Sequence, residues 1–174
     1  MAIYSKTAPT PEQAVVTRVL MNPPFALKTS DEKEFKFVEH ALKQMQDGGI
    51  LFAILPYPSM VRPGVYKHWR QNSLVKHHTL LSVITFHREL FYPADIHPLA
   101  MFVRKGVPHP RQQGVLWLRT LNDGLLKHKR KRLPNPRAKN DFAVIRSTLK
   151  AFLANQAHPV QEIPFSAGRT NRFL

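Results

Sequence analysis

The most constraining feature of the sequence is the segment 49–55, which is apolar at almost every position. A strand with one solvent-facing side alternates apolar and polar residues, whereas a nearly continuous apolar run indicates a strand covered on both faces, as in a parallel sheet flanked by helices. Pro56, Tyr57 and Pro58 follow the run and end it. The sequence therefore predicts an α/β fold built around a covered strand.

Helical and extended segments alternate on either side of this run. β-Branched residues and apolar runs predict further strands at 15–21, 80–86, 99–104 and 114–121. Apolar residues at helical spacing predict helices at 31–47, 64–75 and 141–155. The last of these helices carries four large apolar residues on one face: Phe142, Ile145, Leu149 and Phe152. This order predicts the second half of a Rossmann-like, doubly wound sheet with a C-terminal helical extension, and ligands of such sheets bind beyond the carboxyl ends of the strands.

The charge of the chain indicates a polyanionic partner. Lysine and arginine number 26 against 11 acidic residues, which gives a formal net charge of +15 over 174 residues. A field of this size favours nucleic acid as the partner. A membrane surface is disfavoured, because no segment has the basic amphipathic length or the apolar run that a membrane helix needs.

Basic residues concentrate after the turn Asn122-Asp123-Gly124. Phosphate contacts are the function that such a cluster would serve, although a solvated turn is the alternative. The predicted DNA-binding residues are Lys127, Lys129, Arg130, Lys131 and Arg132.

Several classes of site are excluded or disfavoured by composition. The absence of cysteine excludes disulfides, thiolate zinc sites and cysteine nucleophiles. No metal site is expected either, because His77, His78, His87 and His97 lack the spacing of metal ligands. Residues 1–11 contain no apolar signal core, so a cytoplasmic location is the expectation.

The tetrapeptide Asn22-Pro23-Pro24-Phe25 directly follows the strand predicted at 15–21. The lone pair of an exocyclic amino group is delocalised into its ring, so the nitrogen becomes nucleophilic only when acceptors hold its two hydrogens. The Asn22 side-chain oxygen and the Pro23 carbonyl are the candidate acceptors, and the two prolines stiffen the loop. Phe25 is expected to stack on the target base, which must first leave its helix.

With the segments that follow this tetrapeptide, the chain resembles the N6-adenine DNA methyltransferases, most closely the modification (M) subunits of type I restriction-modification systems. The resemblance extends from about residue 15 to residue 153 and is carried, after the tetrapeptide, by residues 37–42, 48–56, 83–86, 90–93, 100–105 and 118–132. It implies an enzyme that transfers a methyl group from S-adenosylmethionine to DNA, with Asn22, Pro23, Pro24 and Phe25 as its catalytic loop. It also implies a separate specificity subunit as a partner.

The chain departs from the family pattern upstream of this loop. The family holds its methyl donor with a glycine-rich turn and an acidic residue, whereas residues 1–17 contain no Gly-x-Gly and a single acid, Glu12. The sequence is therefore expected to be the catalytic half of such an enzyme, as a fragment or as the product of a split or truncated gene, with its N-terminal half missing. The strand at 15–21 is expected to leave an open edge, and no donor-binding residue can be assigned.

The expected organisation has four parts: an extended lead-in at 1–14, a partial methyltransferase domain at 15–121, a basic segment and C-terminal helix at 122–156, and a polar tail at 157–174. Two alternatives to the leading function stay open. One is a non-catalytic nucleic-acid-binding or assembly module derived from such an enzyme, and the other is methylation of RNA bases or of a protein amide. Tyr57 is expected to pack against its neighbours rather than line the base pocket.

Overall fold

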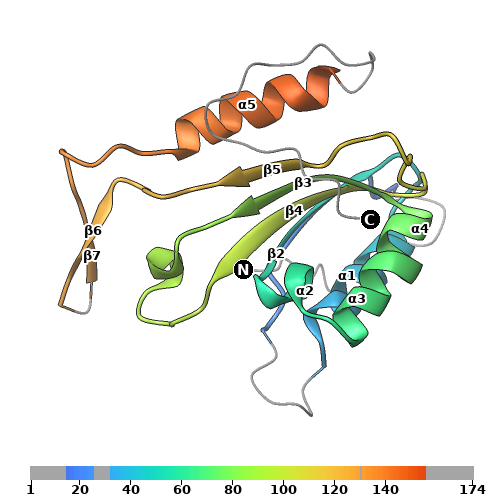
Figure 1. Ribbon diagram of the computed structural model, residues 1–174, viewed down its shortest axis with the longest axis horizontal. Helices are drawn as coiled ribbons and strands as arrows, with labels where there is room; N and C mark the ends of the chain where they lie inside the picture. The colour runs from blue at the N-terminus through green and yellow to red at the C-terminus, as the bar shows by residue number, and fades with distance from the viewer. Residues whose placement is uncertain (1–14, 26–31, 130, 156–174) are drawn as a thin grey trace.

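The computed structural model describes residues 15–25, 32–129 and 131–155, which form a mixed sheet with helices on both faces (Figure 1). The sheet has five strands in the order β1-β2-β4-β3-β5. Their bounds are β1 Arg18–Met21, β2 Ile50–Pro56, β3 Thr79–Thr85, β4 Pro98–Arg104 and β5 Leu116–Arg119. A separate two-stranded hairpin consists of β6 (Leu125–His128) and β7 (Lys131–Pro134).

The three predicted helices lie close to their expected positions. The helices of the structure are α1 Glu34–Gln44, α2 Pro58–Val61, α3 Val65–Trp69, α4 Val75–His77 and α5 Phe142–Asn155, with a π-helical turn η1 at Arg70–Leu74 and a 3-10 turn η2 at Arg88–Phe91. The structure thus adds the short helix α2 and the turn η2 to the prediction. The helix predicted at 64–75 is the unbroken series α3, η1 and α4. The hairpin is an addition to the prediction, which gave only a turn and a basic stretch there.

One strand of the sheet runs against the others. β1 is parallel to β2 and β3 is parallel to β5, but β4 is antiparallel to both of its neighbours, β2 and β3. The expectation of an entirely parallel environment for β2 is therefore wrong on one side. The physical reason lies in the connection from β3 to β4, which contains only the short turn η2 and returns the chain to the adjacent strand, whereas a parallel neighbour needs a longer crossover that usually contains a helix.

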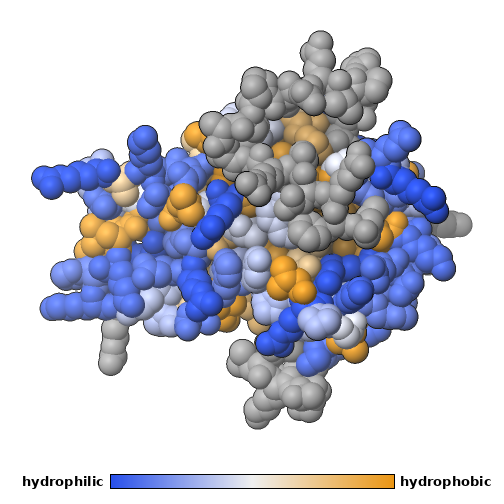
Figure 2. Space-filling view, viewed as in Figure 1, coloured by the Kyte–Doolittle hydropathy of each residue, from blue (hydrophilic) through white to orange (hydrophobic). Residues whose placement is uncertain are grey.

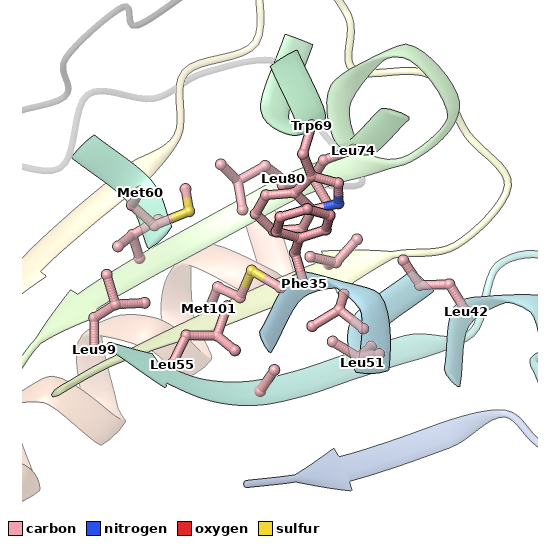
Figure 3. Close-up of a cluster of buried hydrophobic side chains, with 14 of the residues drawn as sticks. Phe35, Leu42, Leu51, Leu55, Met60, Trp69, Leu74, Leu80, Leu99 and Met101 are labelled. Atoms are coloured by element: carbon pink, nitrogen blue, oxygen red, sulfur yellow. The ribbon is translucent and has the colours of Figure 1, made fainter. Parts of the chain in front are cut away.

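One face of the sheet holds the main core (Figure 3). Leu51, Leu55, Leu99 and Met101 are buried there beneath α1 and the helical segment 58–77. Phe35 joins α1 to α3 on this face, because its ring stacks on Trp69 with centroids 5.3 Å apart and an interplanar angle of 19°. Burial of this apolar surface is the main source of stability for the fold.

The other face is covered by α5 over β3, β4 and β5 (Figure 1). The four apolar residues predicted to share a helix face do so, since Phe142, Ile145, Leu149 and Phe152 all pack on this side. Cover is incomplete at the other end of the sheet, where Leu20 of β1 is 80% exposed. On β2 the residues facing this side are only partly buried, so β2 is less completely covered than its apolar sequence predicted, within the described part of the chain.

β1 forms the edge of the sheet and pairs only with β2 among the described residues. The open edge expected for this strand is therefore present in the described structure. None of the described helices has the length and apolar character needed to cross a membrane.

We expect the replacement Leu51→Ala to lower the free energy of unfolding by about 3 kcal/mol, because Leu51 is fully buried in the main core and its removal leaves a cavity. Leu20→Ala on the neighbouring strand is the matched control and should change it by less than about 0.5 kcal/mol. Urea unfolding of the two variants measures both values. Equal losses would show that the Leu20 side chain is covered in solution.

Candidate active site and nucleic-acid interface

The candidate site lies at the end of the sheet where the parallel strands stop and their loops begin. We call this end the loop edge. β1, β2, β3 and β5 share one direction, so their carboxyl ends lie together. The strand ends are level, because Leu55 pairs with Leu99, Leu99 with Thr85, and Thr85 with Arg119. The segments 22–25, 57–58, 86–97 and 120–124 therefore leave the sheet at one edge.

The predicted catalytic loop begins directly after β1. Asn22 and Pro24 are exposed, whereas Pro23 is buried and Phe25 is half-buried. The ring of Phe25 lies against that of Phe91 in η2, with centroids 6.4 Å apart and an interplanar angle of 54°. The loop thus has a buried anchor at Pro23, an accessible amide at Asn22 and an aromatic pair beside it.

Tyr57 and His97 form a second aromatic contact at the loop edge. Their rings stack with centroids 4.5 Å apart, and the Tyr57 N–H donates a 2.7 Å hydrogen bond to the His97 carbonyl. Burial lowers the pKa of His97, with the charges of Arg88 and Arg119 acting in the same direction and a hydrogen bond with the Phe86 backbone opposing them. His97 is therefore neutral over a wider pH range than a free histidine, and its ring serves as packing for Tyr57.

Asp95 lies apart from this pair. Its side chain is 84% exposed, and its carboxylate is 4.0 Å from the Arg88 guanidinium. Surface pairs of this kind contribute little to stability, so Asp95 is available as a neutral control position for substitutions.

The predicted DNA-binding residues map to the β6–β7 hairpin, which projects from one end of the sheet (Figure 1). Hydrophilic side chains gather over this end of the molecule (Figure 2). Lys127, Lys129 and Lys131 are exposed, and Lys129 adopts a positive φ of 52° in the turn. Arg130 lies outside the described residues.

Arg132 has an internal partner instead. Its guanidinium donates two hydrogen bonds to the Asp123 carboxylate, one of them of 2.8 Å from Nη2 to Oδ1. The side chains are only 11% exposed at Arg132 and 4% exposed at Asp123. Arg132 thus differs from the three exposed lysines, because its charge is already paired with that of Asp123.

Asp123 collects two further polar contacts. His87 Nε2 lies 3.1 Å from Asp123 Oδ2, and the Leu125 N–H donates a 3.0 Å hydrogen bond to Oδ1. We call His87, Asp123 and Arg132 the Asp123 cluster. Burial by itself raises the pKa of Asp123, but the hydrogen bonds from Arg132 and Leu125 and the charges of His87 and Arg132 outweigh burial and lower that pKa below its ordinary value.

Tyr92 links the hairpin to the loop that carries Phe91. Its hydroxyl donates a 2.6 Å hydrogen bond to the Lys129 carbonyl, and the Lys127 ammonium lies 4.5 Å from the centroid of its ring. The second contact has the geometry of a cation–π interaction. The basic hairpin and the aromatic pair Phe25–Phe91 are therefore parts of one connected edge.

Sequence reasoning missed the roles of Phe91, Tyr92, His87 and Asp123 in this edge. In the sequence, Phe91 and Tyr92 stand out only as part of the segment 90–93 that resembles the family, and Asp123 only as part of a turn. The hydrogen bond from the Leu125 N–H to Asp123 could have been predicted, because Asp side chains often accept a hydrogen bond from the backbone N–H two residues on. Among the described residues, no group of three histidine or acidic side chains is placed to hold a metal ion.

Comparison with known proteins identifies the family. The family model described as N-6 DNA Methylase matches residues 7–164, which is most of the chain. The chain belongs to this family. The predicted resemblance to the N6-adenine DNA methyltransferases is therefore confirmed.

The chain is also similar to individual proteins over part of their length. The type II restriction enzyme and methyltransferase RM.BcgI of Heyndrickxia coagulans is 30% identical over 118 residues, which are 66% of this chain and 18% of that protein. A structure solved in work on complex assembly and conformational transition of the type I R-M system superimposes with a TM-score of 0.63 at 20% identity, over 84% of this chain and 32% of that one.

The methyltransferase subunit of the type I restriction-modification system from Streptococcus thermophilus gives a TM-score of 0.59 at 18% identity, over 89% of this chain and 34% of that one. These likenesses confirm the predicted fold class. The chain spans 18% of the curated relative and about a third of the two solved chains.

We expect Asp123→Asn to destabilise the chain at neutral pH and to have little effect at low pH. A carboxylate with a lowered pKa adds stability above its ordinary pKa of about 3.9, and that stability is lost as the pH falls through the lowered value. Urea unfolding from pH 7 to pH 3 should show a cost of about 2 kcal/mol at neutral pH that shrinks with acidification. The exposed Asp95→Asn is the control, and a cost for Asp123→Asn that is independent of pH would contradict the expectation.

Proposed function

We propose that this chain supplies the target-base part of a restriction-modification adenine-N6 DNA methyltransferase. The single observation that carries the proposal is the position of Asn22-Pro23-Pro24-Phe25 beyond the carboxyl end of β1, with the ring of Phe25 beside Phe91, in a chain of the N-6 DNA methylase family. Ligands of such sheets bind at this edge. Asn22, Pro23, Pro24 and Phe25 are the proposed catalytic residues.

The chemistry follows from the loop. S-adenosylmethionine, when bound, supplies an electrophilic methyl group for the adenine amino nitrogen. The exposed Asn22 amide oxygen and the Pro23 carbonyl accept hydrogen bonds from the two amino hydrogens, which makes the nitrogen more tetrahedral and more nucleophilic. The buried Pro23 ring and the fixed φ of both prolines keep the acceptors in place.

The aromatic residues hold the base. Phe25 stacks on the face of the extruded adenine, and Phe91 supports the Phe25 ring from the neighbouring loop. Stacking on an aromatic side chain is worth about 1–3 kcal/mol per base. This stabilisation offsets part of the cost of taking the base out of the duplex.

The DNA partner is held by charge. Lys127, Lys129 and Lys131 are the exposed cations of the hairpin and are the proposed phosphate contacts, together with Arg130. The proposed organisation places the methyltransferase part at 15–121 and the basic segment and last helix at 122–156. Recognition of the DNA sequence is assigned to a separate specificity subunit.

The target-base role predicts a preference for an adenine that is already unpaired. A duplex with a mismatched adenine costs less to open, so the wild-type chain should bind it more tightly than the matched duplex. Asn22→Ala and Phe25→Ala should abolish the preference and keep the affinity for matched duplex. Fluorescence anisotropy with labelled duplexes measures both affinities without a methyl donor.

Asn72→Ala is the matched control for this experiment. Asn72 is exposed in η1. Because η1 precedes the amino end of β3, Asn72 lies toward the end of the sheet opposite the loop edge, away from Asn22. Its loss should leave the preference unchanged. A chain that binds both duplexes equally well would favour the non-catalytic binding module over the target-base role.

For the methyl donor, we expect the isolated chain to bind S-adenosylmethionine too weakly to detect by calorimetry at micromolar concentrations, and to transfer no methyl group by itself. The family pattern has a glycine-rich donor turn upstream of the catalytic loop, and β1 has no partner on that side among the described residues. Micromolar binding would show that other residues of this chain build the donor site. We expect weak binding of S-adenosylmethionine by the isolated chain. We also expect methyl transfer to appear when the N-terminal half of a relative is added.

A further inference from the structure

We propose that Asp123 is a positioning residue for DNA binding. In this proposal Asp123 fixes the β6–β7 hairpin against the loop of Phe91, so that the lysines of the hairpin contact the phosphates beside the extruded base. The inference rests on the proposed function, since it takes the loop edge as the face that receives DNA.

The hairpin has little apolar packing of its own. All four residues of β6 are exposed, and three of the four in β7 are exposed as well. Its large apolar residues Leu125, Leu126 and Leu133 remain 40%, 39% and 42% exposed. A two-stranded hairpin without a buried face is at best marginally stable in water. Its position must therefore depend on specific polar contacts with the rest of the chain.

Asp123 makes the most buried of these contacts. It receives hydrogen bonds from Arg132 of β7 and from the N–H of Leu125 at the start of β6, so one carboxylate holds both strands. Substituting the carboxylate would leave the Arg132 charge unpaired and mostly buried, and this is costly. The Asp123 side chain thus joins both strands at the base of the hairpin, where the Asn135 N–H also donates a 2.8 Å hydrogen bond to the Gly124 carbonyl and a backbone bridge links Asp123 to Asn140.

The carboxylate also lies close to the sheet. His87, whose ring lies 3.1 Å from the carboxylate, follows Thr85 at the end of β3 by two residues. The Thr120 N–H, three residues before Asp123, donates a 2.9 Å hydrogen bond to the Thr85 carbonyl. Asp123 therefore follows the end of the β3–β5 pairing by only a few residues, which places the base of the hairpin close to the sheet.

The far end of the hairpin meets the aromatic loop. Tyr92 contacts both Lys127 and Lys129, and the adjacent Phe91 contacts Phe25. Lysines fixed in this way lie beside the position proposed for the target base. Phosphates next to an extruded nucleotide are the anions that these lysines would neutralise.

The direction in which loss of the Asp123 carboxylate changes the affinity for DNA distinguishes a positioning role from an effect of net charge. The chain has a formal net charge of +15, and loss of any carboxylate raises its attraction for DNA. A positioning role predicts the opposite for Asp123, because a displaced hairpin neutralises fewer phosphates. Asp95 is the matched comparison, since it is an exposed carboxylate in the β3–β4 loop that contains Tyr92.

The experiment measures the affinity of the full chain for a short labelled duplex at several salt concentrations. Asp123→Asn should bind severalfold more weakly at low salt, with a slope of log K against log salt that is shallower by about 0.9 for each phosphate that the hairpin no longer neutralises. Asp95→Asn should bind as tightly as wild type or more tightly. Equal or tighter binding by Asp123→Asn with an unchanged slope would overturn the proposal.

Tyr92→Phe provides a second, independent test if Asp123→Asn fails to fold. It removes the hydroxyl that bonds the Lys129 carbonyl and keeps the ring under Lys127. With circular dichroism showing an intact fold, weaker binding and a shallower slope are expected, and wild-type values would overturn the proposal. A wild-type chain that ignores mismatched adenine but shows the Asp123 effect on matched duplex would count against the target-base role and leave this inference standing.

Discussion

The reversed strand β4 determines how the candidate site is assembled. It pairs with β2 along all seven of its residues and with β3 on its other side, and its residues Leu99, Met101 and Val103 are fully buried. Because β4 is antiparallel to β3, the connection between them begins and ends at the loop edge. Phe91 and Tyr92 therefore lie at the same end of the sheet as Asn22. A parallel β4 would have taken that connection across the sheet and away from the proposed catalytic loop.

Much of the fold was readable because each element carries its own local pattern. The helix 142–155 has four apolar residues on one face, and the strand 50–56 is an apolar run bounded by proline. The side-chain pattern of β4 does not show its direction, since a strand has the same pattern in either orientation; only the short connection from β3 indicates an antiparallel return. The proposed catalytic loop is predicted from its residues alone, but its contact with Phe91 joins segments far apart in the sequence.

The hairpin and the Asp123 cluster show where sequence reasoning ends. Residues 125–134 lack the strict alternation of a half-buried strand, and β6 and β7 together bury almost none of their side chains. Arg132 reads as one cation of a basic run, and only the tertiary structure separates it from Lys127, Lys129 and Lys131 by pairing it with Asp123. A count of charges overestimates the number of cations that are free to bind phosphate.

A buried ion pair is a poor way to gain stability, because the cost of desolvating both charges offsets most of their attraction. The Asp123–Arg132 pair is therefore better explained by the geometry that it imposes than by the free energy that it adds. The same need for fixed geometry applies to the catalytic loop, where an amino nitrogen gains reactivity only if both acceptors are already in place. In the proposed function, proline rings provide that rigidity at Asn22, and the Asp123 cluster provides it for the lysines. The loop edge thus combines two rigid parts, one suited to a flat base and one suited to the charged backbone beside it.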